Sequence, residues 1–141
     1  MKEFKFSIAA TVRINDINYG NHVGYQNHFL FFQEVRIAYL KQFGYTELDI
    51  EGFGLMASSA ECRYKLQMYH GDILEVKCAV TKLANMYFIM EYSIEKDGEI
   101  CAEGSTKNLC YDYSKDEFVG LPDAFVKNVK KFEGVRLILN S

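Results

Sequence analysis

The pattern of apolar and polar positions changes its period along the chain. Residues 4–13 alternate loosely between apolar and polar, which predicts a strand with one buried face. In residues 25–43 the apolar positions recur at helical spacing on one broad arc, which predicts a long helix that ends at Gly44. Because this helix is predominantly apolar, we expect a sheet to wrap around it. The arc contains Phe29, Phe32, Val35, Tyr39, Leu40 and Phe43.

Four strand-like runs follow the helix, and turn signals separate them. Asp97-Gly98 is a typical hairpin signal, and consecutive hairpins predict an antiparallel sheet. A short amphipathic helix is expected after Pro122, over residues 123–132. The order of strand, long helix and four antiparallel strands predicts an α+β domain. The runs cover residues 55–68, 73–83, 86–95 and 100–113.

The run at residues 55–68 separates apolar from charged side chains. We expect its apolar face to lie on the core and its charged face to meet water or a partner subunit. The expected core face carries Met56, Ala60, Cys62, Tyr64, Leu66 and Met68, and the other face carries Glu61, Arg63, Lys65 and Gln67.

Composition supports one globular domain over residues 1–141. The chain is 49% hydrophobic with a single proline, and its net charge of −3 without a basic stripe gives no support for nucleic-acid binding. No apolar run approaches the roughly 20 residues that span a bilayer, so we expect no membrane insertion. The four cysteines form no CxxC pair, and the first residues lack an apolar export signal. We therefore expect a cytoplasmic protein with reduced thiols.

A polar loop joins the first strand to the long helix. It carries Asp16, Asn18 and His22 together with Gly20 and Gly24, a composition that favours a turn. Since the loop runs directly into an apolar helix, its polar groups are expected at the mouth of a buried layer, where ligand sites form.

The order of elements and the loop residues together resemble the hot-dog fold, specifically the 4-hydroxybenzoyl-CoA thioesterase-like family of acyl-CoA thioesterases. Many members read Arg-x-x-Asp-x-Asp, then Gly-His-Val-Asn-Asn-x-x-Tyr-Leu, and later Glu-x-x-Arg in the helix. This chain matches at Arg13, Asp16, His22, Val23 and Arg36, and departs at Asn18, Asn21, Gly24, Tyr25 and His28.

The resemblance implies a fold, an activity and an assembly. The fold would be an antiparallel sheet of about five strands wrapped around one long central helix. The substrate would be an acyl-CoA or acyl-carrier thioester, bound without a cofactor in a groove shared by two subunits of a homodimer or homotetramer.

Asn18 stands where the family has its catalytic carboxylate. An amide is neither a base nor a useful nucleophile, although its NH₂ can donate to an oxyanion or position a water. His22 can instead act as general base, since imidazole titrates near ~6.5; plant acyl-ACP thioesterases are similar in using a histidine at this position. Alternatively, the site resembles enediyne polyketide thioesterases, which carry Asn here and depend on a helix arginine, matched by Arg36.

Each candidate also has a structural interpretation. The helical wheel places Arg36 inside the apolar arc, so we expect it to be buried against Asp16 or Glu61, and its role could be that ion pair alone. The role of His22 could be limited to capping or hydrogen bonding within its own loop.

The helix start offers a candidate oxyanion site at the N–H groups of Gly24 and Tyr25, with Asp16 nearby. Gly24 could equally serve only the turn. His28 is expected to be a hydrogen-bonded core or interface histidine, and Glu34 a solvated or dimer-facing charge. The spacing of Asp16, His22 and His28 matches no common ligand pattern, so we expect no metal.

Three functions follow from the sequence and stay open: an acyl-CoA thioesterase, a thioesterase acting on an acyl or polyketide carrier, and a non-catalytic protein that binds acyl thioesters. The acyl group itself is not identified by the sequence.

Overall fold

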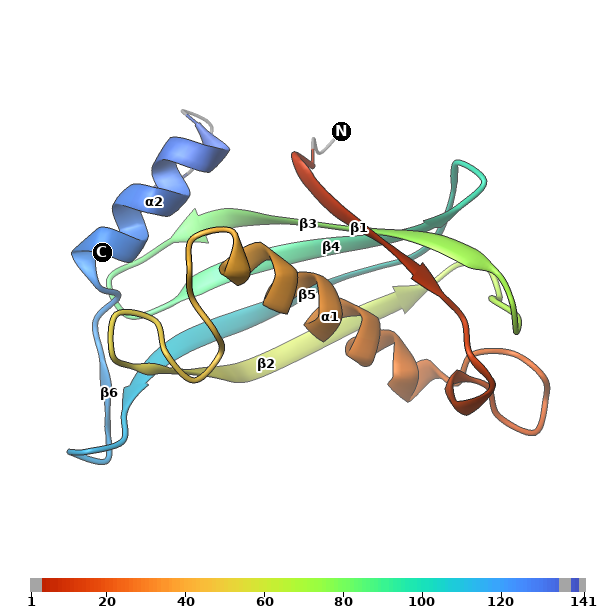
Figure 1. The fold of residues 1–141 in the computed structure, drawn as a ribbon, viewed down its shortest axis with the longest axis horizontal. Helices are drawn as coiled ribbons and strands as arrows, with labels where there is room; N and C mark the ends of the chain where they lie inside the picture. The colour runs from red at the N-terminus through yellow and green to blue at the C-terminus, as the bar shows by residue number, and fades with distance from the viewer. Residues whose placement is uncertain (1–3, 135–137, 140–141) are drawn as a thin grey trace.

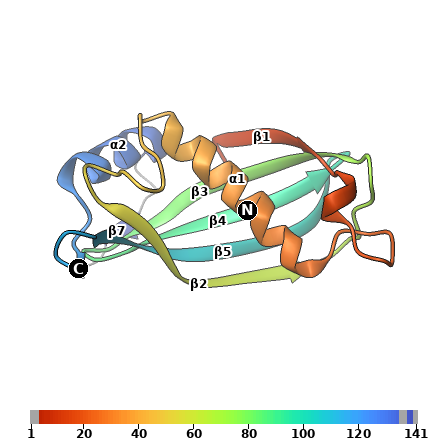
Figure 2. The ribbon, with the colours of Figure 1, turned by 60° about the horizontal axis from the view of Figure 1, so that its bottom comes forward.

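A computed structural model describes residues 4–134 and 138–139 of the chain, which form one mainly antiparallel sheet with a helix across its face (Figures 1 and 2). The main strand order is β1-β3-β4-β5-β2, and all neighbours on this path are antiparallel. The long strands are β1 (Phe6–Thr11), β2 (Gly54–Tyr64), β3 (Ile73–Leu83), β4 (Phe88–Lys96) and β5 (Glu99–Asp112).

Two short strands extend this sheet beyond the expected number of about five. Three-residue β6 (Glu117–Val119) pairs with β5, and two-residue β7 (Ile138–Leu139) runs parallel to β3, so the described sheet has seven strands. Neither is long enough to show a period in the sequence, which is why the pattern revealed the five long strands alone.

Helix α1 (His28–Lys41) confirms the helical period predicted for residues 25–43. A 3-10 turn, η2 (Tyr25–Asn27), precedes it, so the regular helix starts three residues later than expected. Gly44 follows its last turn with a φ of 83°, a left-handed conformation that glycine adopts without strain. The face of α1 on the sheet buries Phe31, Phe32, Val35, Tyr39 and Leu40.

Helix α2 (Asp123–Glu133) confirms the second predicted helix and lies at one end of the sheet (Figure 1). It buries Phe125 and Val129. The carboxylate of Glu133 accepts hydrogen bonds from the hydroxyl of Tyr39 at 2.6 Å and from the N–H of Val80 at 3.0 Å. Val80 lies where the β3–β4 register shifts. The carboxylate of Glu133 on α2 therefore accepts a backbone N–H at an irregular point of the β3–β4 ladder.

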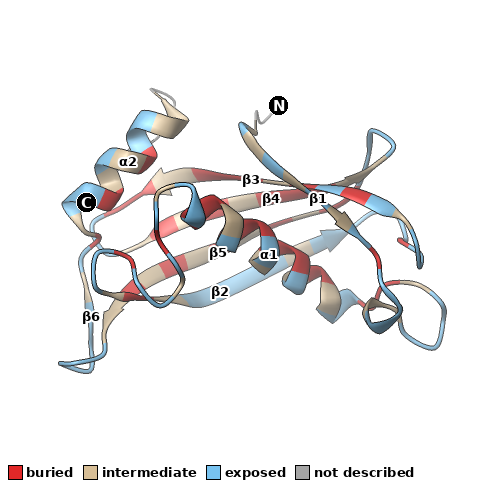
Figure 3. Cartoon of the chain, viewed as in Figure 1, coloured by how far each residue is buried: buried red, intermediate tan, exposed pale blue. Residues whose placement is uncertain are grey.

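Strand β2 is less buried than expected, because the face predicted to lie on the core is only partly covered. Most of its side chains are exposed on both faces, and among the residues expected on the core Met68 alone is fully buried (Figure 3). The reason is its place at the end of the strand order, where β5 is its neighbour on one side and no described strand pairs with the other edge.

Candidate functional site

The loop after β1 folds into a tight turn around residues 18–21. Ile17 and Val23 form an isolated antiparallel bridge, and inside it the N–H of Asn21 donates to the carbonyl of Asn18 at 3.0 Å. Asn21 has a φ of 68°, a left-handed conformation that asparagine tolerates better than most residues. The turn that the polar composition predicts is therefore present in the structure. It brings Asn18 towards His22.

Asn18 and His22 face the same small space above Gly20. The amide oxygen of Asn18 accepts the N–H of Gly20 at 2.8 Å. A Cβ at Gly20 would lie 3.1 Å from Oδ1 of Asn18 and 3.3 Å from Nε2 of His22. Because the oxygen of the Asn18 amide is engaged by the backbone, its NH₂ group is the end left to donate to a ligand.

The ring of His22 is oriented by its neighbour in the chain. Its Nδ1 lies 3.2 Å from the carbonyl oxygen of Val23. A carbonyl only accepts, so this contact assigns the proton of the neutral ring to Nδ1 and leaves a lone pair on Nε2. That nitrogen is the one beside Asn18, which suits His22 to accept a proton at the mouth of the site.

His28 lies on the first turn of α1, behind the loop. It is buried, and its Nδ1 lies 3.2 Å from the carbonyl of Gly24, as expected of a hydrogen-bonded core histidine. Burial lowers its pKa below the ordinary value, opposed in part by its backbone hydrogen bonds, so the ring stays neutral. The ring meets Tyr64 edge-on, with centroids 4.7 Å apart.

These residues surround a cavity of about 300 Å³ between the loop, the start of α1 and the end of β2. The hydroxyl of Tyr64 donates to the carbonyl of Tyr25 at 3.2 Å and so ties β2 to the loop. The cavity is lined by Asn18, His22, Val23, Tyr25, His28, Tyr64, Lys65, Leu66, Gln67 and Met68. Sequence reasoning missed the segment 64–68 as part of a site, because no local signal marks a strand end that reaches the site by long-range pairing.

The N–H of Gly24 is less available than expected for an oxyanion site. It donates to the carbonyl of Asp16, at a long 3.4 Å. The side chain of Gln26 folds over Gly24, since a Cβ there would lie 2.9 Å from its Oε1. Tyr25 begins η2, and the first N–H groups of a helix have no carbonyl of a preceding turn to bond, so the N–H of Tyr25 is the better donor of the two.

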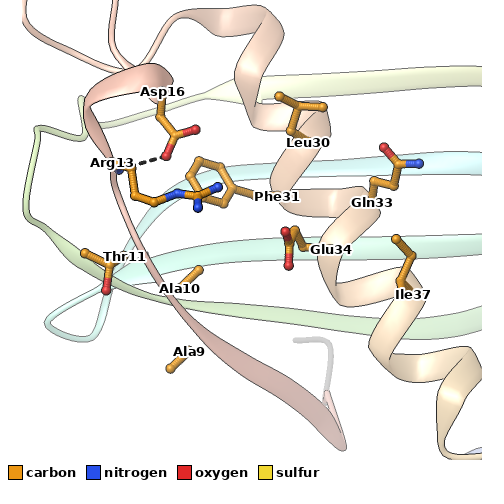
Figure 4. A pocket seen from close by; sticks show the side chains of 10 residues that line it. All are labelled: Ala9, Ala10, Thr11, Arg13, Asp16, Leu30, Phe31, Gln33, Glu34 and Ile37. Carbon is orange, nitrogen blue, oxygen red and sulfur yellow. Dashed lines mark hydrogen bonds between the residues drawn. The ribbon is translucent and has the colours of Figure 1, made fainter.

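Asp16 points away from this cavity. Its carboxylate accepts the N–H of Arg13 at 2.8 Å, and both residues line a second hollow of about 430 Å³ between β1 and α1 (Figure 4). Glu34, which is exposed, lines the same hollow. The structure therefore gathers Asn18, His22, Tyr25 and His28, and places Asp16 on the other side of the loop.

Arg36 is buried, as the helical wheel predicts, yet its expected partner was wrong. Its Nε donates to Glu47 at 2.6 Å, and its Nη1 donates to the hydroxyl of Tyr92 at 3.0 Å. Glu61 pairs instead with Arg63, 2.7 Å away on exposed β2. Arg36 does not line the cavity, and it follows His28 by eight residues, about 12 Å along the helix.

The described residues were also compared with the requirements for metal binding, disulfide bonds and membrane-spanning helices. Within residues 4–134 and 138–139, no group of three His, Cys, Asp or Glu side chains is placed to hold a metal ion. All four cysteines are free thiols. Neither helix in the described part of the chain is long and apolar enough to cross a membrane.

Comparison with known proteins points to one family. Residues 12–129 match the sequence profile of the Thioesterase-like superfamily. A protein of Aquifex aeolicus (strain VF5), provisionally named an esterase, is 26% identical over 110 residues, which cover 77% of this chain and 84% of that protein.

Solved structures share the fold at lower identity. The 1,4-dihydroxy-2-naphthoyl-CoA thioesterase from Synechocystis superposes with a TM-score of 0.82 at 17% identity, covering 92% of this chain and 98% of its own. A thioesterase superfamily structure from Jannaschia sp. CCS1 gives a TM-score of 0.84 at 20% identity, covering 95% and 86%. At these identities the likeness establishes the fold.

Proposed function

The chain belongs to the thioesterase-like superfamily, and from this membership we propose that it hydrolyses acyl-CoA thioesters to a free acid and a thiol. One observation carries the proposal: Asn18 and His22 both line a largely apolar cavity, and Oδ1 of Asn18 and Nε2 of His22 each lie within 3.3 Å of the position that a Cβ on Gly20 would take. A base and a neutral donor beside an apolar acyl site suit water attack on a thioester carbonyl.

In this mechanism Nε2 of His22 removes a proton from a water as the water oxygen attacks the thioester carbonyl carbon. The NH₂ of Asn18 and the N–H of Tyr25 donate to the carbonyl oxygen as negative charge develops on it. The tetrahedral intermediate then collapses, the carbon–sulfur bond breaks, and the protonated His22 returns its proton to the leaving thiolate. No cofactor takes part in this proposal.

A carrier-bound acyl group is the second candidate substrate. Lys65 lies at the cavity with its side chain about half exposed and 3.4 Å from Glu103, so a cation is present where either a CoA phosphate or an acidic carrier would approach. Comparing kcat/KM for the same acyl group on CoA and on acyl carrier protein separates the two substrates.

Binding without catalysis is a candidate of another class, and the amide at Asn18 is the observation that favours it. Without a carboxylate at this position, the cavity would hold a thioester and leave it intact. A thioester that binds tightly and persists unchanged for hours would support this function.

We further propose a homodimer or homotetramer. The outer edge of β2 has no described strand beside it, and an unpaired edge readily takes up a strand from another copy. Pairing there would bring the partner subunit next to Tyr64 at the cavity. Sedimentation equilibrium measures the mass, and a stable monomer would contradict this assembly.

Purified protein assayed for free thiol release against a panel of acyl-CoAs tests the activity. The panel should contain short, long, branched and aromatic acyl groups, because the family leaves the acyl group open. Absence of hydrolysis above background for every member would reject the enzymatic proposal.

A further inference from the structure

The residues that lie behind the cavity determine its depth, and they come from α1 and β2. Phe32 lies one turn after His28 on the same face of α1, and Cys62 lies two residues before Tyr64 on the same face of β2. Since His28 and Tyr64 line the cavity, Phe32 and Cys62 occupy the next layer inward.

The sheet beneath this layer carries no side chain at Gly104, which leaves a space on its surface there. Along the ladders, Gly104 on β5 pairs with Cys62 on β2 and with Tyr92 on β4. The ring of Phe32 fills the gap so closely that a Cβ at Gly104 would lie 2.5 Å from its Cε2. Phe32 also stacks on Tyr92, with centroids 4.5 Å apart and planes 10° from parallel.

A polar network lies one turn further along α1. Arg36 donates to the hydroxyl of Tyr92, which lies 2.7 Å from the hydroxyl of Thr106. Asn108 is fully buried, and its Oδ1 has no hydrogen-bond partner among the described residues. A hydrocarbon chain that passed Phe32 would therefore meet a buried polar network that contains one acceptor, Oδ1 of Asn108, that it cannot satisfy.

We propose that Phe32, seated on Gly104 and stacked on Tyr92, is the floor of the acyl site and restricts the protein to compact acyl groups, either short chains or single rings. This inference rests on the proposed function. The cavity volume of about 300 Å³ is at the low end for ligand sites, and its walls include the ring of Tyr64, which meets the rings of Tyr25 and His28 edge-on. A long straight chain would have to displace the ring of Phe32 to pass beneath α1.

The test is the acyl-length profile of the whole protein. Release of CoA is measured for acetyl-, butyryl-, hexanoyl-, lauroyl-, palmitoyl- and benzoyl-CoA, and binding is measured in parallel with the corresponding non-hydrolysable thioether analogues. We expect kcat/KM and affinity to fall by about tenfold or more between hexanoyl and lauroyl, a step within the range that apolar pockets discriminate. Phe32→Ala should restore most of that loss.

Phe31→Ala is the matched control. Phe31 is also buried on α1, but it lines the hollow between β1 and α1, so its truncation should destabilise the fold while the length profile stays that of the wild type. Phe32→Leu replaces Phe32→Ala if the larger truncation prevents folding.

The outcomes separate the two proposals. A wild-type protein that accepts palmitoyl as well as butyryl, or a Phe32 variant with the profile of Phe31→Ala, would overturn the floor while leaving hydrolysis intact. If no thioester is hydrolysed, the proposed function fails, and the analogue affinities still decide whether Phe32 limits acyl length.

Discussion

Oδ1 of Asn18 and Nε2 of His22 lie about equally far from one point, the position that a Cβ on Gly20 would take, at 3.1 Å and 3.3 Å. This relationship makes the loop a candidate for chemistry, because it holds the proton-accepting Nε2 of His22 close to an amide whose oxygen is already bonded to the N–H of Gly20 and whose NH₂ group is left to donate. It depends on the absence of a side chain at Gly20.

Gly20→Ala should therefore harm turnover more than folding. The added methyl would push Asn18 and His22 apart by a few tenths of an ångström, and we expect kcat/KM to fall by about tenfold because catalytic groups are sensitive to small displacements. Gly20 is exposed, so the unfolding free energy should change by less than about 1 kcal/mol. Unchanged kinetics in this variant would show that the two side chains do not act together.

Asn18→Asp tests whether the amide is functional. A carboxylate can still accept the N–H of Gly20, but it cannot donate to an oxyanion, so kcat should fall by about 100-fold, the usual effect of losing one such donor. Asn21→Asp introduces the same charge at an exposed position of the same turn and should leave kcat unchanged. A large gain of hydrolysis in Asn18→Asp would identify a decayed carboxylate site instead.

His22→Ala removes the proposed base. We expect kcat to decrease by about 10²- to 10⁴-fold, the range typical of general-base catalysis, with little change in thermal stability. His70 is exposed and does not line the cavity, so His70→Ala is the control for removing a histidine. Equal turnover in the two variants would exclude His22 as the base.

Arg36 is expected to stabilise the fold through its pair with Glu47. Arg36→Met removes the guanidinium that donates to Glu47 and Tyr92 and leaves Glu47 with the amide of Gln33 as its donor, and we expect a loss of about 3 kcal/mol in urea unfolding. Turnover per folded molecule should be preserved. A double-mutant cycle with Glu47→Gln measures the coupling between the two side chains. A 100-fold loss of kcat without destabilisation would instead support the catalytic arginine that the family resemblance suggests.

Stability should fall between neutral and mildly acidic pH because of His28. Its pKa in the folded protein is lowered by burial, so below the ordinary value of 6.5 the unfolded chain takes up a proton that the folded protein refuses. The free energy of unfolding should decrease as pH falls below 6.5 and level off once the folded-state pKa is passed. Urea titrations at intervals from pH 7.5 to 5 measure this slope.

His28→Gln should flatten that slope, and an unchanged slope would assign it to another group. The lowered pKa of Asp72 acts in a separate window, because the stability that this carboxylate contributes is present above its ordinary value of 3.8 and is lost as pH falls below it.

The elements that the sequence predicted correctly are those fixed by local periodicity and turn chemistry. The apolar arc placed α1, and Asp97 and Gly98 both adopt the positive φ that their hairpin signal predicts. The composition of the loop likewise predicted the turn that brings Asn18 and His22 together. Each of these features depends on residues close together in the chain.

Partners and exposure were decided by the tertiary structure. The sequence determined that Arg36 would be buried, but the fold chose Glu47 over Asp16 and Glu61, because partner choice depends on which distant segments the chain brings together. The same holds for β2, whose alternating pattern is that of a half-buried strand although it lies at the open edge of the sheet. Local sequence sets backbone geometry and the tendency to be buried, whereas strand order and register decide which side chains meet around a cavity.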